Sequence, residues 1–538
     1  MKFNKISQKL KKKLNDSKGM ALLATLIFTF VISTLGIALL TMTNNETKLT
    51  TLQKESSEAF YLADSGISRA INWLERRPSP PTASVIIANY TYNGTKWIDS
   101  EGNEYPENAT LIPGQYYKIN LTLQTDIDSN RAYKIISTGK LVGPNRNATR
   151  AIEQLVDITN FAEYSYFSNN EGDNIWFYDG DIIDGRLHTN GQLRIDGRPT
   201  FKGLVTSATE PIIWGDNEPH FEIFDTYKYR LGADEYIKLP EKTGDISGTE
   251  NPLSLESIAM GSWTPPGDNT GDNKVYVPHD GSNNSTGGIY VNGNLDALSL
   301  KTVNDLSVIK FQKGSHVTTI TSLPAGIVYP YDGGVSYLND KTIIEEEGVP
   351  PIYYDGLTNG LLYVNGKIQS LEAKESDGGH QGKLTIAATK DITITNDIKY
   401  KTIIDNPLID IHADGADLSS ITDSLGLISE KDIVLDTSNS ITDLEIHAIL
   451  MALGDSIRNQ DYNLNNKDTG ILTIFGGLIQ VKRGPVGTFN SSTNEISTGY
   501  DKDYNFDERM TNPILDAIPP YFPTTGNYEP IYWMESNG

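Results

Sequence analysis

The sequence predicts a mainly β protein that is carried on a long N-terminal α-helix. An uncharged apolar run fills residues 20–42 and continues as an amphipathic stripe to about residue 77. Three segments between residues 116 and 157 alternate apolar and polar side chains, as half-buried strands do. From about residue 161, short β-like runs follow one another with little helical periodicity. These observations indicate a helix, a small β head and a longer β region, in that order.

Composition and charge exclude several function classes. The chain has 538 residues, no cysteine and a formal net charge of −24. Without cysteine there is no disulfide, thiolate metal site or cysteine nucleophile. The overall acidity argues against nucleic acid as a partner, because nucleic-acid binding needs basic patches. Residues 1–19 differ, because seven lysines and Asp16 give them a charge of +6, which leaves about −30 on the remainder.

The apolar run from Met20 to Met42 is predicted to be a retained transmembrane helix. Its 23 residues would span about 34 Å, enough for a bilayer core of about 30 Å. The alternative is a secretory signal peptide, but those apolar cores are shorter and end at a small-residue cleavage site. The lysines before the run, with Glu46 as the first charge after it, place the N-terminus in the cytoplasm. The rest of the chain is then expected outside the membrane.

The helix is predicted to continue beyond the membrane, over residues 43–77. Apolar side chains recur there at helical spacing, and no proline occurs from Met1 to Arg77. Pro78 then ends the helix. The stripe between Leu52 and Leu74 needs an apolar cover, which predicts that this half packs on a soluble domain.

The N-terminal region resembles type IV prepilins. Residues 18–23 read Lys-Gly-Met-Ala-Leu-Leu, like the class III signal of that family, and residues 58–67 are similar to the helix of minor pilins of the PilX kind. The resemblance covers about the first 75 residues. It implies that residues 1–19 are a basic leader and that a membrane peptidase cuts the bond between Gly19 and Met20. The alternative is a plain single-span anchor with a chance glycine.

One departure from the family pattern concerns Ala24. Major pilins carry glutamate at this fifth mature position, where it is thought to pair with the N-terminal amine of a neighbouring subunit. A buried carboxylate in lipid needs a partner, and Ala24 removes that need. The resemblance therefore implies a minor subunit near one end of a filament, not a repeating subunit.

The outer chain is predicted to form a pilin-like head at 78–160 and a right-handed parallel β-helix at 161–490. An Asn-Gly repeat supports the β-helix: residues 187–193, 289–295 and 362–368 share an apolar or β-branched run, Asn-Gly, a polar residue and an aliphatic one. Asn-Gly also favours hairpins, so a sandwich of hairpins is the alternative. Residues 208–287 lack the pattern and are predicted to be an insertion on one side of the solenoid. Residues 491–538 resemble the end of an uncharacterised β-helical domain found behind pilin-like N-termini, and are predicted to cap the solenoid end.

Candidate chemistry is sparse. The densest acidic cluster is Asp179, Asp181 and Asp184; a carboxylate pair could serve glycoside hydrolysis, although Asp-Gly here is also typical of turns. Asp268, Asp272 and Asp280 could hold calcium, but their spacing does not fit an EF-hand, which favours a plain acidic loop. The seven histidines are dispersed. We therefore expect no metal, no cofactor and no enzymatic activity.

These features together predict a membrane-anchored minor pilin or pseudopilin that displays a large β-helix for assembly or adhesion. The expected partners are the membrane, other pilins and the prepilin peptidase, with a surface glycan as a further candidate. The expected location is the bacterial cytoplasmic membrane, with display at the cell surface or a pilus tip. Two alternatives stay open: a surface-anchored carbohydrate-binding or carbohydrate-active β-helix protein, and an anchored adhesin with no pilus connection.

Overall fold

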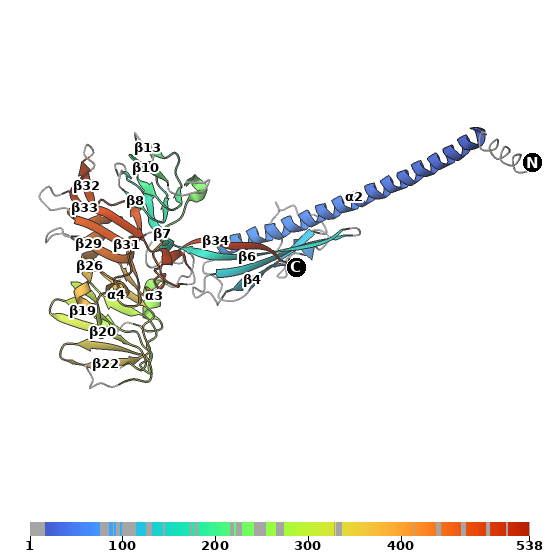
Figure 1. Ribbon diagram of the computed structural model, residues 1–538. Helices are drawn as coiled ribbons and strands as arrows, with labels where there is room; N and C mark the ends of the chain where they lie inside the picture. Colours follow the sequence, from blue (N-terminus) through green and yellow to red (C-terminus); the bar gives the residue numbers. More distant parts are fainter. Residues whose placement is uncertain are drawn as a thin grey trace, which may run out of the picture.

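The computed structural model confirms a mainly β chain with a long N-terminal apolar helix (Figure 1). It describes residues 17–75, 85–89, 91–92, 97–98, 115–124, 132–143, 146–172 and, with gaps, 175–536. Those gaps are residues 178–180, 216–219, 222–228, 241–253, 265–273, 328, 330–335, 414, 437–442, 464–469, 491–494 and 513–514. The basic leader up to residue 16 lies outside the described residues.

Helix α2 (Ser17–Glu75) is one continuous element of 59 residues, as the absence of proline predicts. Its two halves have different surroundings. The half that begins at Met20 extends away from the rest of the molecule, whereas the second half lies along a sheet (Figure 1). The buried side chains of the second half follow helical spacing: Ala59, Leu62, Ala63, Ile67, Ala70 and Leu74.

The sheet under α2 is antiparallel, and together with the packed half of α2 we call it the head. Its strand order is β1-β4-β5-β6-β34. Strands β4 (Gln115–Leu123), β5 (Ala132–Gly143) and β6 (Arg146–Asn160) contain the three segments predicted from alternation. Strand β1 (Val85–Asn89) lies at one edge. Apolar side chains from β4, β5 and β6 form one core with the helix stripe.

The other edge of the head sheet is β34 (Thr524–Ser536), which comes from the C-terminal end of the chain. It pairs antiparallel with β6, with Tyr528 opposite Ile158 and Ser536 opposite Ala151. The prediction that residues 491–538 form one solenoid cap therefore does not describe this strand. The alternating sequence of β34 would suit pairing with any strand, and only the tertiary fold selects β6 as its partner.

Beyond the head, residues 161–522 form a second body, which we call the outer module. Its main ladder is parallel and has the strand order β15-β12-β9-β7-β31-β29-β27-β25-β23-β17. From first to last in that order, these strands span Tyr229–Leu231, Val205–Ser207, Arg186–Thr189, Tyr164–Asn170, Gly470–Lys482, Leu444–Ala452, Ser424–Ser429, Lys383–Ala388, Leu361–Asn365 and Ile289–Asn292. A second parallel ladder beside it runs β18-β24-β26-β28-β30, through Ala297–Val303, Ile368–Ala373, Ile392–Ile398, Ile433–Leu435 and Ile457–Asn459.

Two of the three Asn-Gly repeats stack directly on each other. Tyr290 lies opposite Tyr363 and Asn292 opposite Asn365 in the parallel register, and the two tyrosine rings stack with centroids 6.1 Å apart. Gly366 allows the turns to meet, because a Cβ at this position would lie 2.4 Å from the Gly293 carbonyl carbon. The Asn-Gly pairs therefore do not form hairpins here. The first repeat lies in β9, at a distant place in the ladder.

The strand order contains a seam, where β7 pairs with β31. The chain enters the ladder at β7, extends it through β15, and then crosses to the opposite end to begin again at β17. Residues 208–287 are therefore mainly this crossing, and they contain β15, so they are not an insertion on one side. Helix α3 (Leu255–Met260), within the crossing, packs beside β17 and β23.

An antiparallel meander, β18 to β22, extends the second ladder beyond β18 and was not predicted. Its later strands are β19 (Leu306–Lys313), β20 (His316–Leu323), β21 (Lys341–Glu346) and β22 (Val349–Asp355). Side chains of this meander join the ladder core, among them Phe311, Ile320 and Ile344.

The C-terminal segment before β34 covers a side of the ladder. Strand β33 (Glu495–Phe506) pairs parallel with β31. Met510, Ala517 and Phe522 then pack on the face of the main ladder that carries Tyr363 and Ile449. The main ladder is thus buried on both faces, with the second face covered by the tail and α3.

Candidate functional site

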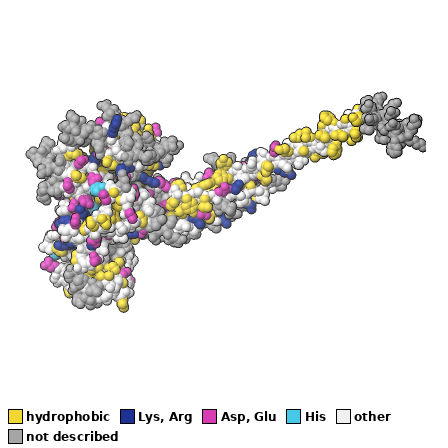
Figure 2. All heavy atoms as spheres, in the orientation of Figure 1, with side chains coloured by type: hydrophobic (Ala, Val, Ile, Leu, Met, Phe, Trp, Pro, Cys, Tyr) yellow, Lys and Arg dark blue, Asp and Glu magenta, His cyan; other side chains and the backbone are white. Residues whose placement is uncertain are grey.

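The first half of α2 is an apolar surface without a cover among the described residues. Every large apolar side chain from Met20 to Met42 is exposed, at 51–73% of its surface, and Figure 2 shows this half as a continuous hydrophobic rod. It is the one helix among the described residues that is long and apolar enough to cross a membrane. Exposed apolar surface of this extent marks a contact with lipid or protein.

The four threonine hydroxyls between Met20 and Met42 are satisfied within the helix. The hydroxyls of Thr25, Thr29, Thr34 and Thr41 each donate to a carbonyl three or four residues earlier, at 2.8–3.0 Å. In hydrocarbon no water is present to take these bonds, so internal pairing is what a spanning helix requires.

Gly19, Met20 and Ala24 all lie in the first turns of α2. Met20 is 62% exposed, and the proposed scissile bond follows the helix start at Ser17 by two residues. No acidic residue lies between Ser17 and Met42. The structure places these residues on the bare half of the helix, but processing at Gly19 stays a prediction.

Two glycines set how closely the second half of α2 approaches the head sheet. A Cβ on Gly139 would lie 2.1 Å from the Ala59 carbonyl oxygen, and a Cβ on Gly66 would lie 2.0 Å from the Ser137 hydroxyl oxygen. At Gly139 the contact is backbone on backbone, which only glycine permits, whereas at Gly66 the nearest neighbour is a side chain. At the end of the contact nearer the N-terminus of α2, Arg146 pairs with Glu58, and Arg150 donates to the Ser56 hydroxyl at 2.7 Å. The exposed half of the helix, which includes residues 20–42, lies on the N-terminal side of these pairs.

The predicted acidic cluster is not brought together as a carboxylate pair. Asp179 lies outside the described residues. Asp181 pairs with Lys502 at 2.8 Å, whereas Asp184 lies 3.8 Å from Lys202. Each described carboxylate therefore has its own cationic partner on a neighbouring segment, an arrangement that serves packing of the ladder.

His188, beside this cluster, is a fully buried polar group of the ladder. Its Nδ1 lies 2.7 Å from the Thr206 hydroxyl and its Nε2 lies 3.0 Å from the Asn190 side-chain oxygen. Burial lowers the pKa of His188 to about 4. The imidazole is therefore neutral at neutral pH and acts as a structural hydrogen-bonding group.

A buried ion pair lies at the seam, which sequence reasoning missed. The Arg483 guanidinium is 3.2 Å from the Glu171 carboxylate, and both side chains are at least nine-tenths buried. The Tyr166 hydroxyl donates to Glu171 at 3.0 Å, and the guanidinium carbon lies 3.9 Å from the centre of the Phe177 ring. A small cavity next to the pair is lined by Asp181, Lys502 and Tyr504, among others. The two partners are 312 residues apart, so no local pattern could have found them.

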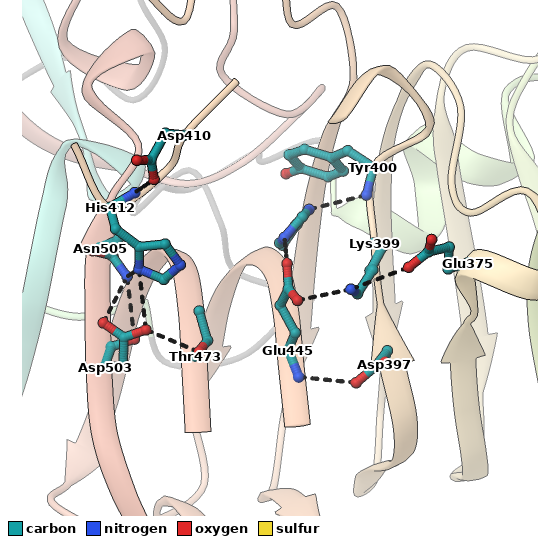
Figure 3. Close-up of polar contacts among 11 residues, drawn as sticks. Glu375, Asp397, Lys399, Tyr400, Asp410, His412, Glu445, Thr473, Asp503 and Asn505 are labelled. Carbon is teal, nitrogen blue, oxygen red and sulfur yellow. Dashed lines mark hydrogen bonds and ion pairs between the residues drawn. The ribbon is translucent and has the colours of Figure 1, made fainter. Parts of the chain in front are cut away.

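A row of polar side chains crosses strands β26, β29, β31 and β33 (Figure 3). Glu445 is its centre: it accepts from His447 at 2.7 Å and pairs with Lys399 at 2.8 Å. Despite burial, these hydrogen bonds to the charged form lower the pKa of Glu445 to about 2. Nδ1 of His447 accepts from the Tyr400 backbone N–H at 3.0 Å, so the imidazole donates to Glu445 through Nε2.

The same row continues on β33. Asp503 accepts from Thr473 at 2.9 Å and from Asn505 at 3.0 Å, and it lies 3.2 Å from His412 (Figure 3). These groups satisfy one another across the strands. Among the described residues, no group of three or more acidic or histidine side chains could hold a metal ion. Asp280 accepts from the backbone of Ser282 and Asn284 in its own turn, while Asp268 and Asp272 lie outside the described residues.

Comparison with known proteins gives a partial match to a family model and distant matches to solved structures. A family model described as a domain of unknown function, DUF4900, matches residues 130–209; these residues run from β5 of the head to β12 of the outer module. The competence-associated pilin ComZ from Thermus thermophilus matches over 90% of this chain and 98% of its own, with 12% identity and a TM-score of 0.28. That score is too low to support an argument. No curated protein matches the chain.

Proposed function

We propose that this chain is a membrane-anchored, pilin-like structural protein, a minor subunit of the PilX kind in a type IV pilus or a related secretion filament. In this proposal a prepilin peptidase removes residues 1–19, and the helix that begins at Met20 spans the cytoplasmic membrane once. The N-terminus is cytoplasmic and the bulk of the chain lies outside. We assign the chain no catalytic step and no cofactor.

The observation that carries the proposal is the division of α2. Residues 20–42 are mainly apolar, uncharged and exposed, and the same helix packs against an antiparallel sheet from Ala59 onwards. A bare half suits lipid or the helices of other subunits, and a packed half fixes a head to it. The resemblance of residues 18–23 and 58–67 to prepilins adds to this support.

We propose that the outer module is the part of the chain displayed at the cell surface. Its parallel ladders, with aliphatic side chains stacked between them, support winding as a right-handed β-helix. Its bulk beyond the head suggests a position at a filament end, where nothing needs to stack above it, and Ala24 in place of an acid fits that position. We propose assembly or adhesion as the role of this display.

The first test is the N-terminus of the mature protein from its native membrane, read by mass spectrometry. A chain that begins at Met20 is expected. The variant Gly19→Leu should keep residues 1–19 and lose surface display. Gly36→Ala is the matched control, because a Cβ at Gly36 meets nothing within 4 Å, so this variant should be processed normally. A wild-type chain that retains Lys2 to Gly19 would contradict the pilin proposal.

A further inference from the structure

The head and the outer module are joined by two chain segments, which we call the waist. One is the passage from β6 to β7 at Asn160–Phe161, and the other is the return from the outer module at Phe522–Thr524. A single linker between two bodies acts as a hinge, and relative motion is then the default expectation. Two adjacent linkers restrict both bending and twisting, provided that they are held together.

Hydrogen bonds hold the two segments of the waist together. The Asn160 side-chain amide donates to the Phe522 carbonyl at 2.9 Å, and the Phe161 N–H donates to the Pro523 carbonyl at 3.0 Å. The Thr525 hydroxyl donates to the Thr159 carbonyl at 3.1 Å. Asn160 is fully buried, so these bonds are protected from exchange with water.

An ion pair crosses the waist beside these bonds. Arg186 belongs to ladder strand β9, and its guanidinium makes two hydrogen bonds to Glu529 of β34, at 2.8 and 3.1 Å. Glu163, in the short turn after the waist, lies 4.0 Å from the same guanidinium. A two-point contact between guanidinium and carboxylate fixes direction as well as distance. The outer module is therefore tied to β34 as well as to β6.

The far part of β34 is in turn fixed to the helix and its neighbouring strand. The Trp533 ring meets Phe60 of α2 edge to face, with centroids 5.9 Å apart. Glu535 pairs with Arg150 at 2.8 Å, and the Tyr532 hydroxyl donates to Glu153 at 2.8 Å. A continuous path of contacts therefore runs from the outer module through Glu529 and β34 to α2.

We infer that the C-terminal strand β34 is a tie that holds the outer module in one fixed orientation relative to helix α2. The inference rests on the proposed function only in making α2 the membrane anchor. Under that function, β34 fixes the orientation of the outer module relative to the membrane anchor. The fold itself then decides which surface of the module faces outward.

The orientation can be measured in the full chain by distances between two spin labels. The chain has no cysteine, so Thr149→Cys on the head and Ser315→Cys on the outer module would carry the labels alone; both positions are exposed. In detergent, a narrow distance distribution is expected for the otherwise unchanged chain. Arg186→Gln should broaden it, and a chain that ends at Pro523 should broaden it about two-fold or more.

The control is Lys301→Gln, which removes an ion pair to Asp377 of 3.0 Å within the outer module and should leave the distribution narrow. Hydrogen exchange of β27 would confirm that the ladder of each variant is folded. A broad distribution in the unchanged chain, or a narrow one in the chain ending at Pro523 with its ladder intact, overturns the inference. The measurement needs no pilus, so it is independent of whether residues 1–19 are removed.

Discussion

The head and the outer module bury their sheets in different ways. Strand β5 of the head alternates buried and partly exposed side chains along its length, because α2 covers one face. In the outer module, all six residues of β27 are buried, as are most of those of β29, because core packs on both faces. Alternation makes a strand easy to recognise in sequence but says little about its neighbours. A strand that is buried on both faces has an unbroken apolar sequence. The sequence then shows that the strand is buried, but it does not show which side chains point to which face.

The two bodies also differ in whether histidine side chains are buried in their cores. All seven histidines lie beyond residue 161, and His188, His380 and His447 are buried in the ladder region. The head depends instead on close contact between a helix and a sheet. The comparison therefore predicts that backbone crowding damages the head, whereas loss of buried charge or a fall in pH damages the outer module.

The largest expected effect is on the head. Gly139→Val places side-chain carbon against the backbone of Ala59 and Ala63, and should destabilise the head by at least about 4 kcal/mol. Hydrogen exchange should show faster opening of β4 and β5 with β27 unchanged. Gly143→Ala is the control, since its Cβ would meet Arg146 at an ordinary 3.6 Å. An equal loss of stability in the head and in the outer module would contradict the prediction that crowding at Gly139 affects the head alone.

The next effect is confined to the outer module. Arg483→Met leaves Glu171 buried without its cation, and should cost about 3 to 5 kcal/mol. Adding Glu171→Gln should recover most of that loss, because no uncompensated charge remains. Removing the more exposed pair of Lys383 and Asp516 by Lys383→Met should cost less than about 1 kcal/mol. Urea unfolding, followed by exchange in β7 and in β5, would assign each loss to its body.

A matched pair of isoleucines sharpens the comparison within α2. Ile67 is 3% exposed in the head core and Ile27 is 55% exposed on the bare half. Ile67→Ala should destabilise the head by about 3 kcal/mol, whereas Ile27→Ala should change it by less than about 0.5 kcal/mol. Urea unfolding in detergent measures both. A loss of head stability in Ile27→Ala would show that the bare half contributes to the fold.

The smallest effect concerns pH. Burial holds His188 neutral in the folded chain with its pKa lowered to about 4, so the unfolded chain takes up a proton first as the pH falls below about 6.5. Stability from this group is full above that value and is lost as the pH falls toward 4, by about 2 kcal/mol at pH 5.

Glu163 opposes this effect, because burial raises its pKa to about 7 and its contribution grows as the pH falls. The test therefore compares variants. The stability difference between the unchanged chain and His188→Gln should shrink from pH 7.5 to pH 5. A constant difference for His188→Gln would contradict the buried, neutral state.

The sequence was informative wherever structure is local. Proline absence up to Arg77 predicted one continuous helix, and alternation located β4, β5 and β6. The matching repeats at Tyr290 and Tyr363 predicted parallel stacking. The seam, the meander and β34 were not predictable, because they depend on which distant edge each strand meets. Asp181 and Asp184 looked like a cluster for the same reason: their cations, Lys502 and Lys202, are supplied by other segments.

The pairing of β7 with β31 also sets an order of events for a chain that is synthesised from its N-terminus. Strand β7 emerges early, yet the strand that it needs, β31, follows some 300 residues later. Until then β7 keeps an open edge, which is prone to pairing with the wrong chain. Folding of the outer module can thus finish only after nearly all of it has been synthesised, and a chain cut short before residue 470 would leave that edge exposed to proteases and chaperones.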